Sequence, residues 1–270
     1  MNHPQAARRI VVGIDGSDAA INAAKWAVAE ATSRDVPLRL IHVIPERRAD
    51  APADDESLDV QYGETSLRAA SAALHAMDEP VKIETDLVHG SPASALIDES
   101  RDAAMVCLGS VGIGQIARKV IGSTADAVAQ NARCPVAVIR TNREAGESPS
   151  GSIAVVVDAK PGNDAVLEQG FGEAVLRKAP ILAMGAWRWG FGEIPYRKLD
   201  RRLRPWVTQH PGVHVRPAAA RNGAADFITS TQEPVQLAVV PKEDADKVAR
   251  MVGPLTPHFG RSGCSVLVVR

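Results

Sequence analysis

Two stretches of this chain follow the same order of short apolar runs, and this internal repeat constrains the fold more than any other feature. Residues 10–14 and 153–157 are β-branched runs, and an aspartate directly follows each of them. Each stretch also ends in an apolar run that begins at a cysteine, Cys134 in the first and Cys264 in the second. Since the order of the runs recurs, the chain is predicted to consist of two homologous units.

In the first stretch, apolar runs alternate with segments of helical spacing. The expected strands are 9–14, 37–44, 81–88, 104–108 and 134–139, and the expected helices are 19–34, 62–77, one entered at Ser91 and Pro92, and 123–131. Residues 46–59 are polar and are expected to form a loop, and Ser17 is expected to cap the first helix. This alternation predicts an α/β fold of two tandem, doubly wound units, each with a parallel five-stranded sheet. The expected domains are 1–145 and 150–270, joined by a polar linker at 141–151.

Composition and charge limit the class of protein. The net charge is −1, no run of about 18 apolar residues occurs, and the three cysteines form no CxxC pair. We therefore expect a soluble cytoplasmic protein without a membrane partner, a disulfide framework or a zinc site. The segment Tyr196 to Trp206 carries five basic residues and could touch nucleic acid, although such a segment is more often the solvated face of an amphipathic helix, so nucleic acid is not the expected partner.

The candidate ligand-binding motif follows the fourth expected strand. Gly109-Ser-Val-Gly112 is separated by nine residues from Gly122-Ser123, where a helix is expected to begin. Glycines let backbone amides approach an anion, and helix N-termini attract phosphate. Ser123 and Asp126 also have the spacing of a capping box, so the hydroxyl could serve the helix start alone.

This Gly-x2-Gly-x9-Gly-Ser spacing, together with Ile10-Val-Val-Gly-Ile-Asp15-Gly-Ser17, is similar to the ATP-binding signature of the universal stress protein family. The resemblance spans the first half, and two such units resemble the tandem bacterial branch of that family. It implies a Rossmann-like fold and a role in stress response or signalling. It also implies ATP, with Mg²⁺ bound to its phosphates.

The resemblance also implies roles for individual residues. Asp15 would face the adenine and the backbone of Val43 would hydrogen-bond it. Gly109 and Gly112 would line the ribose and phosphates, and Gly122, Ser123 and Thr124 would contact the phosphates. The resemblance also places three further residues in the nucleotide site, Gly13, Ile14 and Leu108.

The second half departs from the motif. Pro241-Lys-Glu-Asp244 stands where Gly-x2-Gly is expected, and Gly253-Pro254 stands where Gly-Ser is expected. Proline removes an N–H donor, and Asp244 would bring negative charge to the place of the phosphates. We therefore expect this half to bind no nucleotide. The second half does keep an aspartate after its first strand, Asp158. The simpler interpretation of Asp158 is a turn residue that caps the next helix.

The first half also allows interpretations other than a non-hydrolysing ATP site. Gly112 to Ala117 fits the dinucleotide fingerprint but follows the wrong strand. The chain has no Walker A motif, so slow or no ATP turnover is expected. A weak ATPase or phosphotransferase that uses Arg118 and Lys119, and a scaffold that binds no nucleotide, remain as alternatives.

The two terminal apolar runs predict how the halves associate. Residues 136–139 and 266–269 would each leave an unpaired sheet edge in an isolated unit. The halves carry opposite charge, with 15 basic and 21 acidic side chains in residues 1–150 and 16 and 11 in residues 151–270. We expect an intramolecular pseudo-dimer, formation of a homo-oligomer, and a protein partner that the sequence does not identify.

Overall fold

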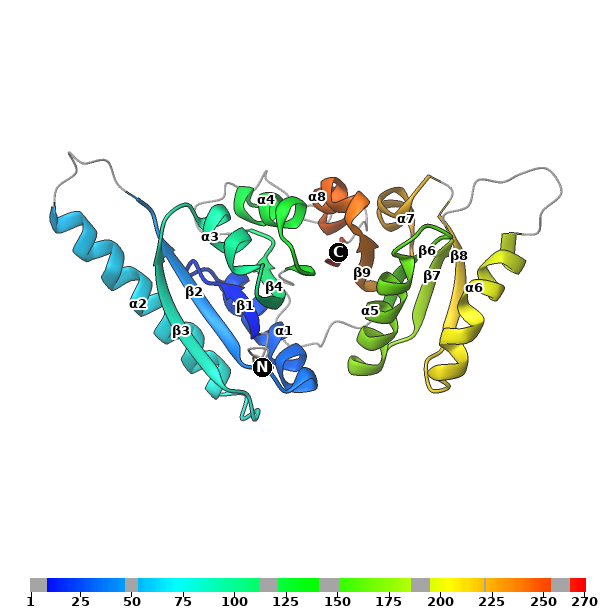
Figure 1. The fold of residues 1–270 in the computed structure, drawn as a ribbon, viewed down its shortest axis with the longest axis horizontal. Coiled ribbons are helices and arrows are strands. Elements are labelled where there is room, and N and C mark those ends of the chain that lie inside the picture. Colours follow the sequence, from blue (N-terminus) through cyan, green and yellow to red (C-terminus); the bar gives the residue numbers. More distant parts are fainter. Residues whose placement is uncertain are drawn as a thin grey trace, which may run out of the picture. The chain divides into compact units, whose positions relative to one another are not determined.

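The protein divides into two compact units, Met1–Thr141 (unit 1) and Asn142–Arg270 (unit 2). The computed structural model describes residues 9–46, 53–111, 121–140, 151–185, 195–220, 222–253 and 263–270 (Figure 1). Within these ranges, no helix has both the length and the apolar character needed to cross a membrane.

Unit 1 is a parallel sheet between two layers of helices. Its strands are β1 (Arg9–Gly13), β2 (Leu38–Ile44), β3 (Ile83–His89), β4 (Ala103–Gly109) and β5 (Val136–Ile139), in the spatial order β3-β2-β1-β4-β5. Helices α1 (Asp18–Arg34) and α2 (Ala53–His75) pack together on one face, and α3 (Pro92–Glu99) packs with α4 (Ser123–Asn131) on the other (Figure 1). The strand order reverses between β1 and β4, since β2 and β3 lie on one side of β1 and β4 and β5 on the other, and ligands bind at such a switch point.

Unit 2 has the same sheet order, β8-β7-β6-β9-β10, and its strands are also parallel. Its elements are β6 (Ser152–Val157), α5 (Asn163–Leu176), β7 (Ile181–Gly185), α6 (Pro195–Gln209), β8 (Val215–Ala219), α7 (Ala224–Ser230), β9 (Val235–Pro241), the 3₁₀ helix η1 (Lys242–Lys247), α8 (Val248–Val252) and β10 (Ser265–Val269). The expected fold class, two tandem doubly wound units with parallel sheets, is therefore confirmed.

Burial explains why the central strands are continuous apolar runs. Both faces of the sheet are covered by helices, so strands such as β1 and β6 have no polar face. Alanines line the buried side of α1, which lets the helix lie close to the sheet. A Cβ on Gly109 would lie 2.7 Å from the backbone carbonyl carbon of Ala19. Gly109 therefore lacks a side chain for a packing reason, because α1 passes directly over it.

The structure corrects two local predictions. The segment 46–59 is not all loop, because α2 already begins at Ala53. Residues 53–75 contain no proline, so the sequence does not interrupt a helix that begins at Ala53. The capping box at Ser123 is also wrong, because Gly122 occupies the N-cap position and no side chain caps α4. Ser17 does cap α1, since its Oγ accepts a hydrogen bond from the Ala20 N–H at 3.2 Å.

Candidate functional site

A pocket of about 300 Å³ opens in unit 1 where β1, β2 and β4 end. Nine of the ten residues predicted for the site line it: Gly13, Ile14, Asp15, Val43, Leu108, Gly109, Gly122, Ser123 and Thr124. The tenth, Gly112, lies outside the described residues, as do Arg118 and Lys119. The volume is at the lower end of the range of small-molecule sites.

One end of the pocket is formed by the start of α4. The first intrahelical bond of α4 runs from the Asp126 N–H to the Gly122 carbonyl at 3.0 Å. The N–H groups of Ser123, Thr124 and Ala125 precede it, and all three residues line the pocket. Three backbone donors at the positive end of a nine-residue helix make this end suited to an anion.

Gly122 joins this helix start to the end of β4. Its N–H donates to the Ser110 carbonyl at 2.8 Å, which fixes the distance between the two segments. Its backbone has φ −72° and ψ 148°, an extended conformation that residues with side chains also adopt. Conformation therefore does not require glycine at this position.

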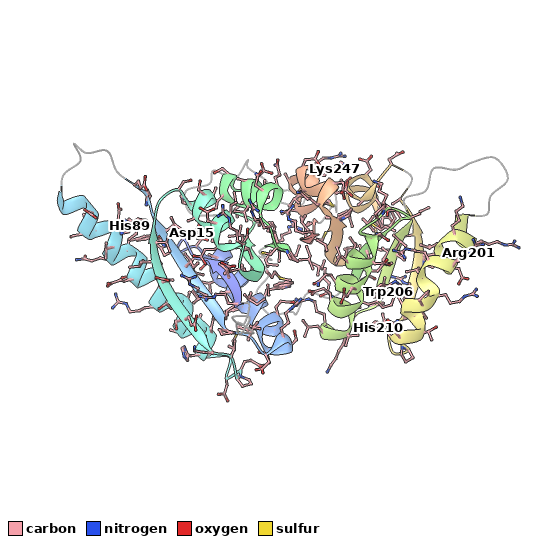
Figure 2. The ribbon with its side chains drawn as sticks, viewed as in Figure 1. Asp15, His89, Arg201, Trp206, His210 and Lys247 are labelled. Carbon is pink, nitrogen blue, oxygen red and sulfur yellow. The ribbon has the colours of Figure 1, made fainter. Side chains whose placement is uncertain are left out.

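The other end of the pocket is formed by the segment after β1. Asp15, labelled in Figure 2, accepts hydrogen bonds on Oδ1 from the Ser17 N–H at 3.0 Å and the Ser17 Oγ at 2.6 Å. Because Ser17 also caps α1, the aspartate is tied to the start of that helix. Ile14 and Val43 add apolar surface beside the carboxylate. This end combines an acceptor with apolar walls, a combination suited to a flat ring that carries N–H donors.

Sequence reasoning missed a third wall of the pocket. Pro92 and Leu96 of α3 line it, together with Ile41 and His42 of β2. The signal for α3 was present, because Ser91-Pro92 places a helix start directly after β3, at the carboxyl edge of the sheet. A Cβ on Gly13 would lie 2.7 Å from Leu108 Cδ2 and 3.1 Å from Leu96 Cδ1, so the glycine in β1 makes room for these leucines.

His42 is buried, with 7% of its surface exposed, and its Nδ1 lies 2.8 Å from the Ile14 carbonyl oxygen. His89, labelled in Figure 2, ends β3. Among the described residues, no group of three or more His, Cys, Asp or Glu side chains could hold a metal ion.

Unit 2 has a smaller pocket, of about 140 Å³, at the equivalent strand ends. The strand registers define the equivalence, because Val12 pairs with Cys107 in unit 1 and Val155 pairs with Val239 in unit 2. Counted from these pairs, Asp158 corresponds to Asp15, Pro241 to Gly109, Asn163 to Ala20 and Val156 to Gly13.

In unit 2 a polar side chain, Asn163, stands at the position of Ala20 in unit 1. Asn163 is buried; its Oδ1 accepts from the Asp158 N–H at 3.1 Å and its Nδ2 donates to the Val156 carbonyl at 2.9 Å. The Asp158 carboxylate accepts from the Lys160 N–H at 2.9 Å, so it is the turn residue that the simpler reading expected. It does not cap α5, whose N-cap is Gly162.

The predicted obstacles to phosphate also line the pocket of unit 2. Pro241 has no N–H, and Glu243 and Asp244 are acidic. Asp244 Oδ1 lies 2.6 Å from Lys247 Nζ, and this hydrogen bond raises the pKa of Lys247 above its ordinary range. Pro254 lies outside the described residues.

Comparison with known proteins agrees with this architecture. The profile of the universal stress protein family matches residues 6–140. Universal stress protein Rv2624c of Mycobacterium tuberculosis is 46% identical over 97% of this chain and 96% of its own length, and Rv3134c of the same organism is 38% identical over 100% and 98%. A solved universal stress protein from Archaeoglobus fulgidus, 13% identical, covers 97% of this chain and 96% of its own with a TM-score of 0.72, which is a likeness of fold. The chain belongs to the universal stress protein family.

Proposed function

We propose that this protein binds ATP in the pocket of unit 1, and in that unit alone, as part of a stress response or signalling function in the cytoplasm. The observation that carries the proposal is the pocket itself. It combines three N–H groups at the start of α4 with an apolar, carboxylate-bearing end at Asp15, so its two ends match the triphosphate and the base of one ligand.

Each contact in the proposed complex follows from this arrangement. Asp15 and the backbone of Val43 receive the adenine, and Gly109 borders the ribose and phosphates. Gly122, Ser123 and Thr124 receive the phosphates, and Gly112 is assigned there by the motif. Mg²⁺, when bound with ATP, neutralises phosphate charge. The protein acts through the ATP-bound form, recognised by a protein partner of unknown identity.

Unit 2 serves in this proposal as a built-in partner of unit 1. Within unit 1, β5 forms one edge of the sheet, and within unit 2 β10 does so. An uncovered edge invites pairing with another strand. The net charges of the two halves, −6 and +5, favour association of unit 1 with unit 2. Homo-oligomers built from such pairs remain part of the proposal.

The first experiment is mass spectrometry of the small molecules released from natively purified protein. ATP or another adenine nucleotide is expected. Calorimetric titration with Mg·ATP should then give one site per chain, and two equivalent sites would contradict the assignment to unit 1. Phosphate release above a protein-free blank, lost in Gly122→Val, would favour the ATPase alternative. Failure to bind any nucleotide would favour a scaffold.

A further inference from the structure

Two successive backbone carbonyls after β1 accept hydrogen bonds from side chains of other elements. The His42 Nδ1 lies 2.8 Å from the Ile14 oxygen, and the Tyr62 hydroxyl donates to the Asp15 oxygen at 2.9 Å. A carbonyl oxygen only accepts, so Nδ1 of His42 carries the proton. With both carbonyls held, the peptide groups on either side of Asp15 have fixed orientations.

The helix α2 lies close enough to make these contacts because glycines stand where it approaches. A Cβ on Gly63 would lie 2.7 Å from His42 Cδ2, and a Cβ on Gly16 would lie 2.5 Å from the Tyr62 hydroxyl. Gly16 also has φ +86°, a conformation that favours glycine. The rings of His42 and Tyr62 meet edge to face, with centroids 5.8 Å apart. The two side chains therefore form one packed pair.

Unit 2 repeats half of this arrangement. Its second helix, α6, also donates to the carbonyl of the first-strand aspartate, from Arg202 Nε to the Asp158 oxygen at 3.3 Å. Arg202 further pairs with Asp164 at 2.7 Å. The position that corresponds to His42 is Gly185, since Leu40 pairs with Val12 and Ala183 with Val155. A bond from the helix to the aspartate carbonyl thus belongs to both units, whereas the histidine is present in the unit with the larger pocket.

We propose that His42 and Tyr62 are positioning residues for the nucleotide, an inference that rests on the proposed ATP site. Ile14, Asp15 and His42 line the pocket, and Tyr62, which is 47% exposed, reaches it through the Asp15 carbonyl. By holding the two carbonyls, the pair presents the Asp15 carboxylate and the Ile14 wall to the base. His42 and Tyr62 therefore affect the base end of the pocket and not the end formed by α4.

Because adenosine has the base but no phosphates, comparing it with ATP tests which end of the pocket is affected. The experiment is calorimetric titration of the full chain with Mg·ATP and, separately, with adenosine. Tyr62→Phe removes the hydroxyl and keeps the ring. Its affinity for both probes should fall by the same factor, about 5- to 10-fold, as expected for one lost hydrogen bond. Ser123→Ala, at the phosphate end, should weaken ATP and leave adenosine unchanged. Loss of stability alone would not produce this contrast between probes.

Arg202→Met is the matched control, because it removes the corresponding bond in unit 2 and should leave both affinities as in the parent. His42→Asn retains an amide N–H near the place of Nδ1 and should bind better than His42→Leu, which has no donor. If Tyr62→Phe binds both probes like the parent, or if Arg202→Met weakens them equally, the positioning role is wrong while the ATP site stands. If the parent binds neither probe, the proposed function itself fails.

Discussion

Units 1 and 2 share a sheet order and a helix layout, and they differ in what stands at the strand ends. In unit 1 Gly13, Ala20 and Gly109 leave space there, whereas in unit 2 the corresponding residues are Val156, Asn163 and Pro241. The backbone fold has thus been kept while larger side chains accompany a smaller pocket at the strand ends of unit 2. The same fold therefore accommodates pockets of different size at the switch point, and the side chains at the strand ends set that size.

Gly122→Val should produce the largest effect on unit 1. Valine fits the backbone conformation of Gly122, but its branched side chain would take up space at the proposed phosphate end of the pocket, which Gly122 lines. ATP affinity should fall by about 100-fold or more, which is roughly 2.7 kcal/mol. Calorimetric titration measures the affinity, and the thermal unfolding midpoint should stay near that of the parent.

Gly253→Val in unit 2 should give the reverse pattern. Gly253 has φ +70°, where a valine is strained by about 1–3 kcal/mol. This variant should unfold earlier and bind ATP like the parent. A Gly122→Val protein that binds ATP normally would place the phosphates elsewhere.

Separating the units tests whether unit 2 is a partner. Residues 1–145 expressed alone should self-associate or aggregate, because β5 would be an uncovered edge without the proposed partner. Adding residues 150–270 should restore a defined complex in size-exclusion chromatography with light scattering. Raising the salt concentration should weaken this rescue, since it screens the opposite charges. A stable, monomeric first half that ignores the second would contradict the partner role.

Asn163→Ala should destabilise unit 2 without creating a nucleotide site. The substitution leaves the Asp158 N–H and the Val156 carbonyl without their present partners, at a cost of about 1–3 kcal/mol. Denaturant unfolding measures the loss. Asn131→Ala is the matched control, because that side chain is exposed and bonds to its own helix, so its change should stay within about 0.5 kcal/mol. A second ATP site in Asn163→Ala would show that Pro241 and Asp244 are no barrier.

Lys247→Met should have the smallest effect. The ion pair with Asp244 is partly exposed, so its loss should cost less than about 1 kcal/mol at neutral pH. Because the pKa of Lys247 is raised in the folded state, the pair stabilises below the ordinary lysine pKa and loses this effect as pH rises through the folded value. The difference between variant and parent in urea unfolding should therefore shrink above about pH 10.5. A stability difference between variant and parent that grows above this pH would contradict the assigned ion pair of Lys247 with Asp244.

The fold and most of the pocket were predictable because their signals are local. An apolar run followed by Asp15 marks a strand end, and glycine spacing marks the start of α4. The contacts that hold the segment after β1 are not local. Tyr62 bonds to a residue 47 positions away, and no pattern in either segment indicates that the two meet.

The same limit applies to what a pattern says about individual residues. The spacing of Ser123 and Asp126 fits a capping box, but the chain enters α4 one residue earlier, with Gly122 at the cap. Gly109 fits a ligand loop, and the passage of α1 over it is a sufficient reason for its glycine. A sequence motif marks such positions, but it does not show which neighbouring segment determines the residue type there.

The buried Asn163 has a consequence for how the chain responds to its surroundings. A ligand that binds the folded form of unit 1 stabilises it by about 2.7 kcal/mol at a concentration 100 times its Kd, and this contribution declines with the ligand concentration. Unit 2 carries its own side chain at the corresponding position, so its stability is set by the chain itself. If unit 1 binds ATP as proposed, a falling ATP supply should raise hydrogen exchange and proteolysis in unit 1 first.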